Sequence, residues 1–320
     1  MYDRITLWVD AYRVEDKIPH LVDLLENGKM QTGIKDHRKT IYGSIQGADI
    51  SIYESGSIRI GLSLPKFLYG DNITPLTRYT TEEAIGKLSD TLGIDVADAR
   101  VSSLEYGYSF LMQHKATAYI ERMGEMPRRL RYLFCSGGLY YRHRTKGNKQ
   151  PDEFVFYDKA TEAKIKKMPI PQGFEDANFL RIELKLNGSI AKQMGMADVV
   201  ASTLYDRQFY SKLRKRYIDT YFSITKLPKL NANFMDAIRS PKDAVDAFIG
   251  LMLAKAGQGQ QEIDAYINEL KANGIFKDRV NYKRVKDALY KAASKAKLSS
   301  KDELVAELDD CFINLKANGG

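Results

Sequence analysis

A tyrosine and a lysine two residues apart are the pair in this chain best suited to chemistry. Tyr157 ends the apolar segment 154–157, and Lys159 follows after one aspartate. In an extended strand both side chains would share one face, because side chains alternate with period two. A phenol beside an ammonium group could attack a phosphodiester, with the lysine favouring loss of the phenolic proton. The alternative is an ordinary strand tyrosine, since the chain has 20 tyrosines.

Two carboxylates lie within otherwise apolar or aromatic strand candidates. Glu105 falls in the segment 101–112 and Glu183 in the segment 179–186. An ionised carboxylate is costly inside a sheet, so it is usually paired, or it points at a cleft or a metal ion. Oxygen ligands from neighbouring strands suit Mg²⁺ or Mn²⁺. We therefore predict a divalent-cation site at Glu105 and Glu183, with exposure to solvent or pairing to nearby basic residues as the alternative.

Basic charge indicates a polyanionic partner. The net charge is +8 and the pI is about 9.1, and a basic surface attracts nucleic acid in a salt-dependent way. Tyrosine rings add faces on which unpaired bases can stack. The predicted DNA-binding residues are Lys66, Asn72, Arg142, His143, Arg181, Arg214, Lys215 and Arg216. A simple strand exit at 63–72 and a solvated helix face at 212–217 are the alternatives.

The elements that must position these residues predict an α+β fold. Apolar alternation predicts strands, and 3-4 apolar spacing after cap-like residues predicts helices. Strands are expected at 5–9, 40–46, 49–54, 57–64, 101–112, 130–134, 139–144, 154–157 and 179–186, and helices at 18–25 and, after a cap at 80–83, at 84–92. From residue 190 onwards helix formers dominate. We predict a domain of mixed α and β structure at 1–230 and a helical domain at 240–320.

Composition argues for a cytoplasmic protein with no membrane partner. No apolar run is long enough to cross a bilayer, and the N-terminal residues lack the basic-then-apolar layout of a signal peptide. Cys135 and Cys311 are far apart and in no metal-ligand spacing, so both are expected to be reduced.

Four short segments, in this order, resemble the rolling-circle replication initiators of the filamentous-phage gene II/X type, which also occur on small bacterial plasmids. Segment 64–72 is similar to that family's lysine-then-Gly-x-Asn stretch, and Glu105 lies where the family has an acidic strand residue. Segment 156–159 resembles its Tyr-x-Lys, and segment 180–183 its Arg-x-Glu. Two departures are Glu105 in place of the usual Asp, and Asp71 where a histidine can occur.

The resemblance implies an antiparallel-sheet nicking endonuclease of the HUH-like kind. Tyr157 would be the nucleophile that forms a 5′-phosphotyrosine, helped by Lys159, while Glu105 and Glu183 would hold the Mg²⁺ or Mn²⁺. Implied partners are double- and single-stranded origin DNA, a host polymerase and helicase, and a second copy in a homodimer. The helical region after residue 240 would recognise DNA or dimerise. A second catalytic tyrosine is not identifiable.

Two alternatives come from other readings of the same residues. A non-enzymatic initiator or regulator could bind origin repeats through helices, with no metal ion and no covalent step. A mobilisation relaxase would use the same chemistry for conjugation. The four histidines include no histidine-hydrophobic-histidine triplet, which argues against the relaxase and against the commonest tyrosine nicking enzymes.

Overall fold

The chain divides into two compact units. The structure is a computed structural model, and it describes residues 1–27, 30–35, 37–135, 137–144, 150–165, 177–227, 238–255, 260–296 and 302–317. Unit 1 comprises residues 1–226 and 307–320, and unit 2 comprises residues 227–306. Within the described ranges, every helix is too short or too polar to cross a membrane.

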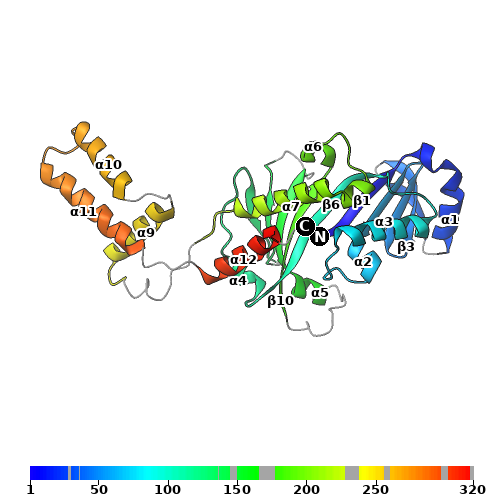
Figure 1. Ribbon diagram of the computed structural model, residues 1–320, viewed down its shortest axis with the longest axis horizontal. Helices are drawn as coiled ribbons and strands as arrows, with labels where there is room; N and C mark the ends of the chain where they lie inside the picture. The colour runs from blue at the N-terminus through cyan, green and yellow to red at the C-terminus, as the bar shows by residue number, and fades with distance from the viewer. Residues whose placement is uncertain are drawn as a thin grey trace. The chain divides into compact units, whose positions relative to one another are not determined.

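An antiparallel sheet forms the centre of unit 1 (Figure 1). Its described strands run in the order β2-β3-β4-β5-β1-β6-β10-β9-β8-β7. They are β1 (Tyr2–Val9), β2 (Gln31–Lys35), β3 (Arg38–Ile45), β4 (Ala48–Tyr53), β5 (Ile58–Ser63), β6 (Arg100–Met112), β7 (Leu130–Leu133), β8 (Leu139–Arg142), β9 (Asp152–Asp158) and β10 (Asn178–Asn187). The predicted α+β class with a large antiparallel sheet is confirmed.

Unit 1 also contains helices, which differ in how their ends are capped. They are α1 (Ile18–Glu26), α2 (Leu64–Tyr69), α3 (Arg78–Leu92), α4 (Ala116–Ile120), α5 (Lys159–Ile165), α6 (Ile190–Met194), α7 (Arg207–Phe222) and the part of α12 (Glu303–Ala317) from residue 307 on, with short 3₁₀ turns η1 (Ala11–Arg13), η2 (Glu15–Lys17) and η3 (Ala201–Tyr205). Helix α3 starts earlier than predicted, because Thr77 and Thr80 form a reciprocal capping box. The predicted strand exit at 64–69 is a helix, which ends at Gly70 with a φ of 86°.

Helix α7 covers one face of the central strands, and the predicted chemical residues lie on the other. Tyr217 of α7 lies with its ring centre 5.5 Å from that of Tyr106 and 5.6 Å from that of Phe154. Side chains alternate along a strand, so residues an odd number of positions from Tyr106 on β6 or from Phe154 on β9 point to the opposite face. Glu105 and Tyr157 therefore lie on the face that α7 leaves uncovered.

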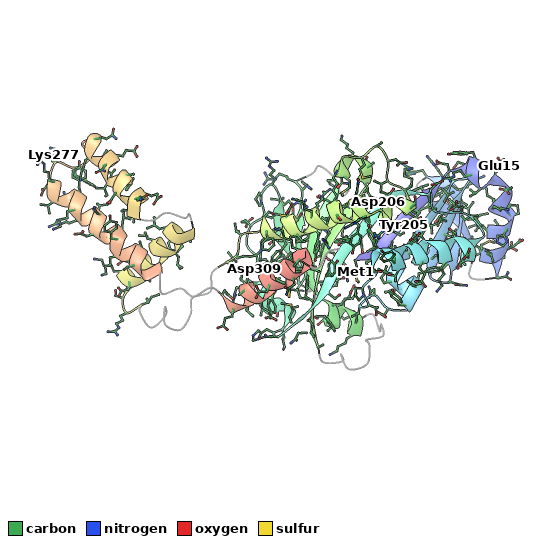
Figure 2. All side chains as sticks on the ribbon, viewed as in Figure 1. Met1, Glu15, Tyr205, Asp206, Lys277 and Asp309 are labelled. Carbon is green, nitrogen blue, oxygen red and sulfur yellow. The ribbon has the colours of Figure 1, made fainter. Side chains whose placement is uncertain are left out.

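The last residues of the chain, from 307 on, belong to unit 1. The sequence instead predicted one helical domain over the whole range 240–320. Phe312 of α12 stacks on Tyr221 of α7, with ring centres 3.7 Å apart and an interplanar angle of 6°. Figure 1 draws the ribbon of α12 beside that of α7. The Tyr221 hydroxyl donates a hydrogen bond to Asp309 of α12 at 2.7 Å. Figure 2 labels this aspartate. Local periodicity predicts a helix here but not the distant aromatic residues against which it packs.

Replacing Phe312 with alanine should lower the free energy of unfolding of unit 1 by about 3–5 kcal/mol, the usual cost of removing a buried aromatic ring. The side chain is 0% exposed and contacts three further rings besides Tyr221. Urea denaturation followed by tyrosine fluorescence measures the loss. Ile313→Ala is the matched control, because that neighbouring side chain is 50% exposed. Equal losses for the two variants would contradict the packing of α12.

Unit 2 is helical, as predicted for the C-terminal region. Its helices are α9 (Pro241–Lys255), α10 (Gln260–Ala272) and α11 (Arg279–Ala296). Asp264 of α10 accepts a hydrogen bond from the Tyr290 hydroxyl at 2.6 Å and pairs with Lys286 at 2.7 Å, both on α11. Ile263 and Ile267 of α10 are buried in the small core of this unit.

Candidate active site

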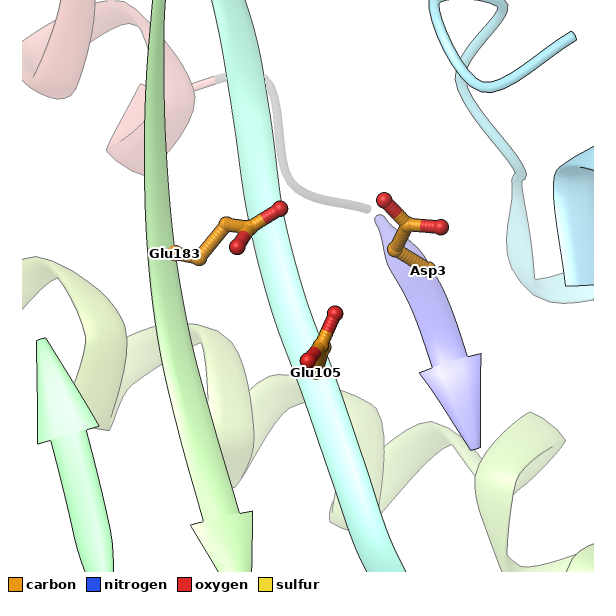
Figure 3. Close-up of side chains that lie close together, drawn as sticks. All are labelled: Asp3, Glu105 and Glu183. Carbon is orange, nitrogen blue, oxygen red and sulfur yellow. The ribbon is translucent and has the colours of Figure 1, made fainter. Parts of the chain in front are cut away.

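Three carboxylates from neighbouring strands converge on the face of the sheet opposite α7. Asp3 lies on β1, Glu105 on β6 and Glu183 on β10. Each offers one oxygen, and these oxygens lie within 4.8 Å of one another. Figure 3 shows the three side chains directed toward the same point. The two glutamates predicted from the sequence are thus brought together, with an aspartate that was not predicted.

Asp3 was missed because β1 is irregular. Regular alternation would place Asp3 on the same face as Ile5 and Leu7, which are core residues. The pairing of β1 with β6 instead shifts register between Tyr2 and Ile5. Such a bulge adds a residue and turns the following side chains to the other face. The available signal was an acidic residue at the start of an apolar strand.

Arg181 forms hydrogen bonds to two carboxylates of the cluster. Its guanidinium donates to Asp3 at 2.9 Å, to Glu183 at 2.9 Å and to the Ser109 hydroxyl at 3.2 Å. The side chain is 0% exposed. The prediction that Arg181 contacts DNA is therefore wrong, because no polynucleotide can reach it. A buried arginine with a fork of donors instead fixes the orientation of two carboxylates.

Lys185 supplies the second cation. Its ammonium lies 2.8 Å from a Glu105 oxygen and 3.2 Å from a Glu183 oxygen. Three carboxylates against the charges of Arg181 and Lys185 leave one excess negative charge. Oxygen donors with residual negative charge are what Mg²⁺ or Mn²⁺ binds, so this residue set fits a divalent cation. The salt bridges that the sequence offered as the alternative are found, and they lie beside a cluster of carboxylates that could hold a metal ion.

The two glutamates titrate differently. Burial opposes ionisation of Glu183, but Arg181 and Lys185 outweigh it and lower its pKa to about 2. Burial, reinforced by the charge of Glu183, raises the pKa of Glu105 above its ordinary value. Of the two glutamates, Glu183 therefore stays ionised to lower pH, and Glu105 is the one that acid neutralises first.

Tyr157 is hydrogen-bonded directly to this cluster. Its hydroxyl donates to Glu183 at 2.9 Å, and Tyr157 pairs across the sheet with Arg181. Burial, followed by the charge of Glu183, raises the pKa of the phenol well above its ordinary value. The phenol is accordingly neutral at physiological pH, and its proton must leave during any attack on phosphorus.

Lys159 approaches the tyrosine differently from the predicted shared strand face. Strand β9 ends at Asp158, and Lys159 is the first residue of α5. Its ammonium bonds to Glu162 at 2.7 Å and lies 5.8 Å from the centre of the Tyr157 ring. Burial and the charge of Glu183 are the main causes of the raised pKa of Tyr157, and assistance by Lys159 stays a prediction.

One cleft holds the central residues. It has a volume of about 470 Å³, and its lining includes Asp3, Lys66, Asn72, Glu105, Tyr140, Tyr157, Lys159, Glu183 and Lys185. Asn72 donates to Asp3 at 3.2 Å, while Lys66 is exposed at the rim. These two predicted DNA-binding residues therefore lie beside the tyrosine and the carboxylates.

The other predicted DNA-binding residues lie outside this cleft. His143 and Arg216 both bond to the buried Asp152, at 2.6 Å and 2.5 Å. The remaining ion pairs join Arg142 to Glu153 and Lys215 to Asp219. Arg214 lines a different cleft, on the face covered by α7. DNA contact by these five residues stays a prediction.

Gly107 permits the close approach of β10 to β6 at the site. It pairs with Glu183, and a Cβ atom at this position would lie 2.1 Å from the Ile182 carbonyl oxygen and 2.9 Å from the Glu183 Cα. No real side chain tolerates such contacts, and backbone atoms cannot rotate away.

We expect Gly107→Ala to destabilise unit 1 by about 1–3 kcal/mol, because β10 must shift to relieve overpacking. Thermal denaturation measures the loss. Gly86→Ala is the matched control, since a Cβ there meets nothing within 4 Å and alanine favours a helix by up to about 1 kcal/mol. An unchanged melting temperature for Gly107→Ala would contradict the strand contact.

Comparison with known proteins identifies the family. A search of curated proteins gave no match. One solved structure, described as "Crystal structure of the di-domain ARO/CYC StfQ from the steffimycin biosynthetic pathway", aligns at 10% identity over 70% of this chain and 98% of that chain. The TM-score of this alignment is 0.19, which is too low to indicate a shared fold.

The family Phage_CRI, described as the N-terminal part of a replication-associated protein, matches residues 1–212. The matched range includes the carboxylate cluster and Tyr157. Family membership supports a replication initiator role and confirms the resemblance to the filamentous-phage gene II type. This chain belongs to the Phage_CRI family of replication-associated proteins.

Proposed function

We propose that this protein starts rolling-circle replication by nicking one strand of a phage or plasmid origin and attaching itself to the 5′ phosphate through Tyr157. The observation that carries the proposal is the hydrogen bond from the Tyr157 hydroxyl to Glu183, one of three clustered carboxylates in a single cleft. A nucleophile held against cation-binding oxygens is the arrangement that phosphoryl transfer to a tyrosine requires.

The reaction balances without any further reactant. The Tyr157 oxygen forms a bond to phosphorus, and the bond from phosphorus to the 3′ oxygen breaks. The phenol gives up its proton, and the departing 3′ oxygen takes one up. The products are a 5′-phosphotyrosine and a free 3′-hydroxyl, which a host polymerase can extend. The ester keeps the energy of the broken linkage, so the reverse transfer can rejoin the strand after one circuit.

The cleft residues divide this work. Asp3, Glu105 and Glu183 would hold Mg²⁺ or Mn²⁺, which supplies a Lewis acid that polarises a phosphate oxygen. Glu183 aims the Tyr157 hydroxyl, and because its pKa is about 2 it stays an acceptor and does not keep the proton. Lys66 at the rim of the cleft and Asn72 deeper in it would contact the strand beside the scissile phosphate.

The proposal also covers the architecture of the nicking domain and the role of unit 2. An HUH-like nicking architecture is supported by a catalytic face built on adjacent antiparallel strands, here with carboxylates and no histidine pair among the described lining residues. Unit 2 would recognise origin DNA or dimerise, and its support is the basic stretch on α11 that contains Lys283, Arg284 and Lys286. A host helicase would then unwind the duplex ahead of the polymerase.

The test uses the full chain and supercoiled DNA of the replicon that encodes it. With Mn²⁺ or Mg²⁺ we expect open-circular product and a protein–DNA adduct that survives detergent. A metal chelator should abolish both. Mass spectrometry of the digested adduct should find the nucleotide on Tyr157. Binding without nicking at every metal concentration would overturn the proposal in favour of a non-enzymatic initiator.

A further inference from the structure

A second cleft lies in unit 1, and its lining is basic and aromatic. It has a volume of about 840 Å³ and is lined in part by Arg78, Arg207, Arg214, Tyr79, Tyr108 and Tyr210. No aspartate or glutamate is among its described lining residues. A concave surface with this composition attracts anions and offers flat faces for stacking.

This cleft opens on the face opposite Tyr157. Tyr108 follows Gly107 on β6, so its side chain points away from the carboxylate cluster. Its ring lies 5.9 Å from that of Tyr217 on α7, the helix that covers this face. The two clefts are therefore separated by the thickness of the sheet.

Two of the three arginines in this cleft lie at the N-termini of helices. Arg78 is the first residue of α3, and Arg207 is the first residue of α7, next to Tyr205 and Asp206 (Figure 2). The positive ends of both helix dipoles thus add to the arginine charges. The Asp206 carboxylate accepts from the backbone of Phe209 at 2.8 Å and so caps α7.

A backbone carbonyl and an aromatic ring hold the Arg78 guanidinium in place at this cleft. The Arg78 guanidinium donates to the Tyr205 carbonyl oxygen at 3.3 Å and lies 4.5 Å from the centre of the Tyr79 ring. Tyr79 is nevertheless 70% exposed. A cation supported by a carbonyl and an adjacent exposed ring can meet a phosphate and a base at the same time.

We propose that this second cleft binds single-stranded DNA, with phosphates on Arg78, Arg207 and Arg214 and a base on Tyr79 or Tyr210. The identity of the polymer rests on the proposed function, while the anionic and aromatic character of the ligand rests on the cleft itself. The protein would then bind single-stranded DNA on both faces of one sheet, with one segment at Tyr157 and another in the second cleft on the opposite face.

Cross-linking tests the position of the strand. Full-length protein carrying Tyr157→Phe is irradiated with a single-stranded oligonucleotide containing 5-bromodeoxyuridine, and the cross-linked peptides are identified by mass spectrometry. We expect adducts in the peptides that contain Tyr79 or Tyr210. Cross-links confined to peptides of the first cleft would overturn the proposal.

Salt-dependent binding tests the arginines. Fluorescence anisotropy of a labelled oligonucleotide should show weaker binding by Arg207→Ala, with the slope of log affinity against log salt reduced by about 0.7. Tyr79→Ala should weaken binding about 5- to 100-fold through lost stacking. Both residues are exposed, so melting temperatures should be unchanged. Lys39→Ala, an exposed residue of β3 outside both clefts, is the control, and an equal loss there would contradict the assignment.

The outcomes separate this proposal from the proposed function. Cross-links at Tyr79 or Tyr210 without any adduct at Tyr157 would support the second cleft and reject nicking. An adduct at Tyr157 with unchanged binding by Arg207→Ala and Tyr79→Ala would support nicking and reject the second cleft. Equal binding of a duplex of the same sequence would replace the single strand by double-stranded DNA as the ligand and so overturn the proposal as stated.

Discussion

Tyr157→Phe should abolish the covalent protein–DNA adduct and lower the rate of nicking by more than about 10⁴-fold, as expected for loss of a nucleophile. The substitution removes only the hydroxyl, so the ring and its packing remain. The lost hydrogen bond to Glu183 costs about 1–3 kcal/mol of stability, which leaves unit 1 folded. Denaturing gels measure the adduct, and agarose gels measure the open circle, both in the presence of Mn²⁺.

Tyr140→Phe is the matched control for this result. Tyr140 lines the same cleft but is not bonded to the carboxylate cluster by any described contact. We expect its adduct yield to stay within about threefold of the wild-type yield, which corresponds to less than about 0.7 kcal/mol. An adduct that persists in Tyr157→Phe at the wild-type level would assign the nucleophile to another residue.

Mn²⁺ should raise the melting temperature of the wild-type protein, and Glu105→Gln should remove most of that rise. A ligand that binds only the folded state at 100 times its Kd stabilises it by about 2.7 kcal/mol. Glu105 is the appropriate carboxylate to change, because its bond to Lys185 can be kept by an amide oxygen. Glu183→Gln would instead leave the buried Arg181 short of charge compensation. Differential scanning calorimetry measures the shift without relying on nicking.

Glu153→Gln is the control, because Glu153 lies on the same sheet face but pairs with Arg142 outside the cluster. Its Mn²⁺-induced shift should match that of the wild type. A full shift in Glu105→Gln would place the metal elsewhere.

The same measurement has a defined pH dependence. The pKa of Glu105 is raised, so the Mn²⁺-induced stabilisation should fade as the pH falls through that raised value, before an ordinary glutamate is protonated. The pKa of Glu183 is lowered to about 2, so its contribution to folding stability is present above the ordinary glutamate pKa and is lost as the pH falls toward 2. Acid should therefore release the metal first and unfold unit 1 second. Simultaneous loss of both would contradict this order.

Alternation within strands was sufficient to predict much of the site. Glu183 and Lys185 share a face of β10 as expected, and Glu105 faces away from the aromatic side of β6. These are local properties, because the pleat alone decides which neighbours share a face. The mixed α and β class and the helical character after residue 190 followed from equally local patterns, whereas the antiparallel sheet was implied by the family resemblance.

The remainder depended on interactions between distant segments. Asp3 reaches the cluster through a register shift against β6, which no pattern within β1 reveals. Burial of Arg181 results from strands and helices stacked on both sides of it, whereas composition alone favours an exposed arginine. Lys159 was displaced from the predicted face because the strand ends one residue too early.

The return of Phe312 to the first unit makes residues 227–306 an insertion and not a tail. A fragment cut after residue 226 would lack its closing helix and expose the rings of Tyr217 and Tyr221. A version in which a short glycine-serine bridge joins residues 226 and 307 would retain that helix, since loop length costs little free energy. Studying unit 1 without unit 2 therefore calls for internal excision and not for shortening from one end.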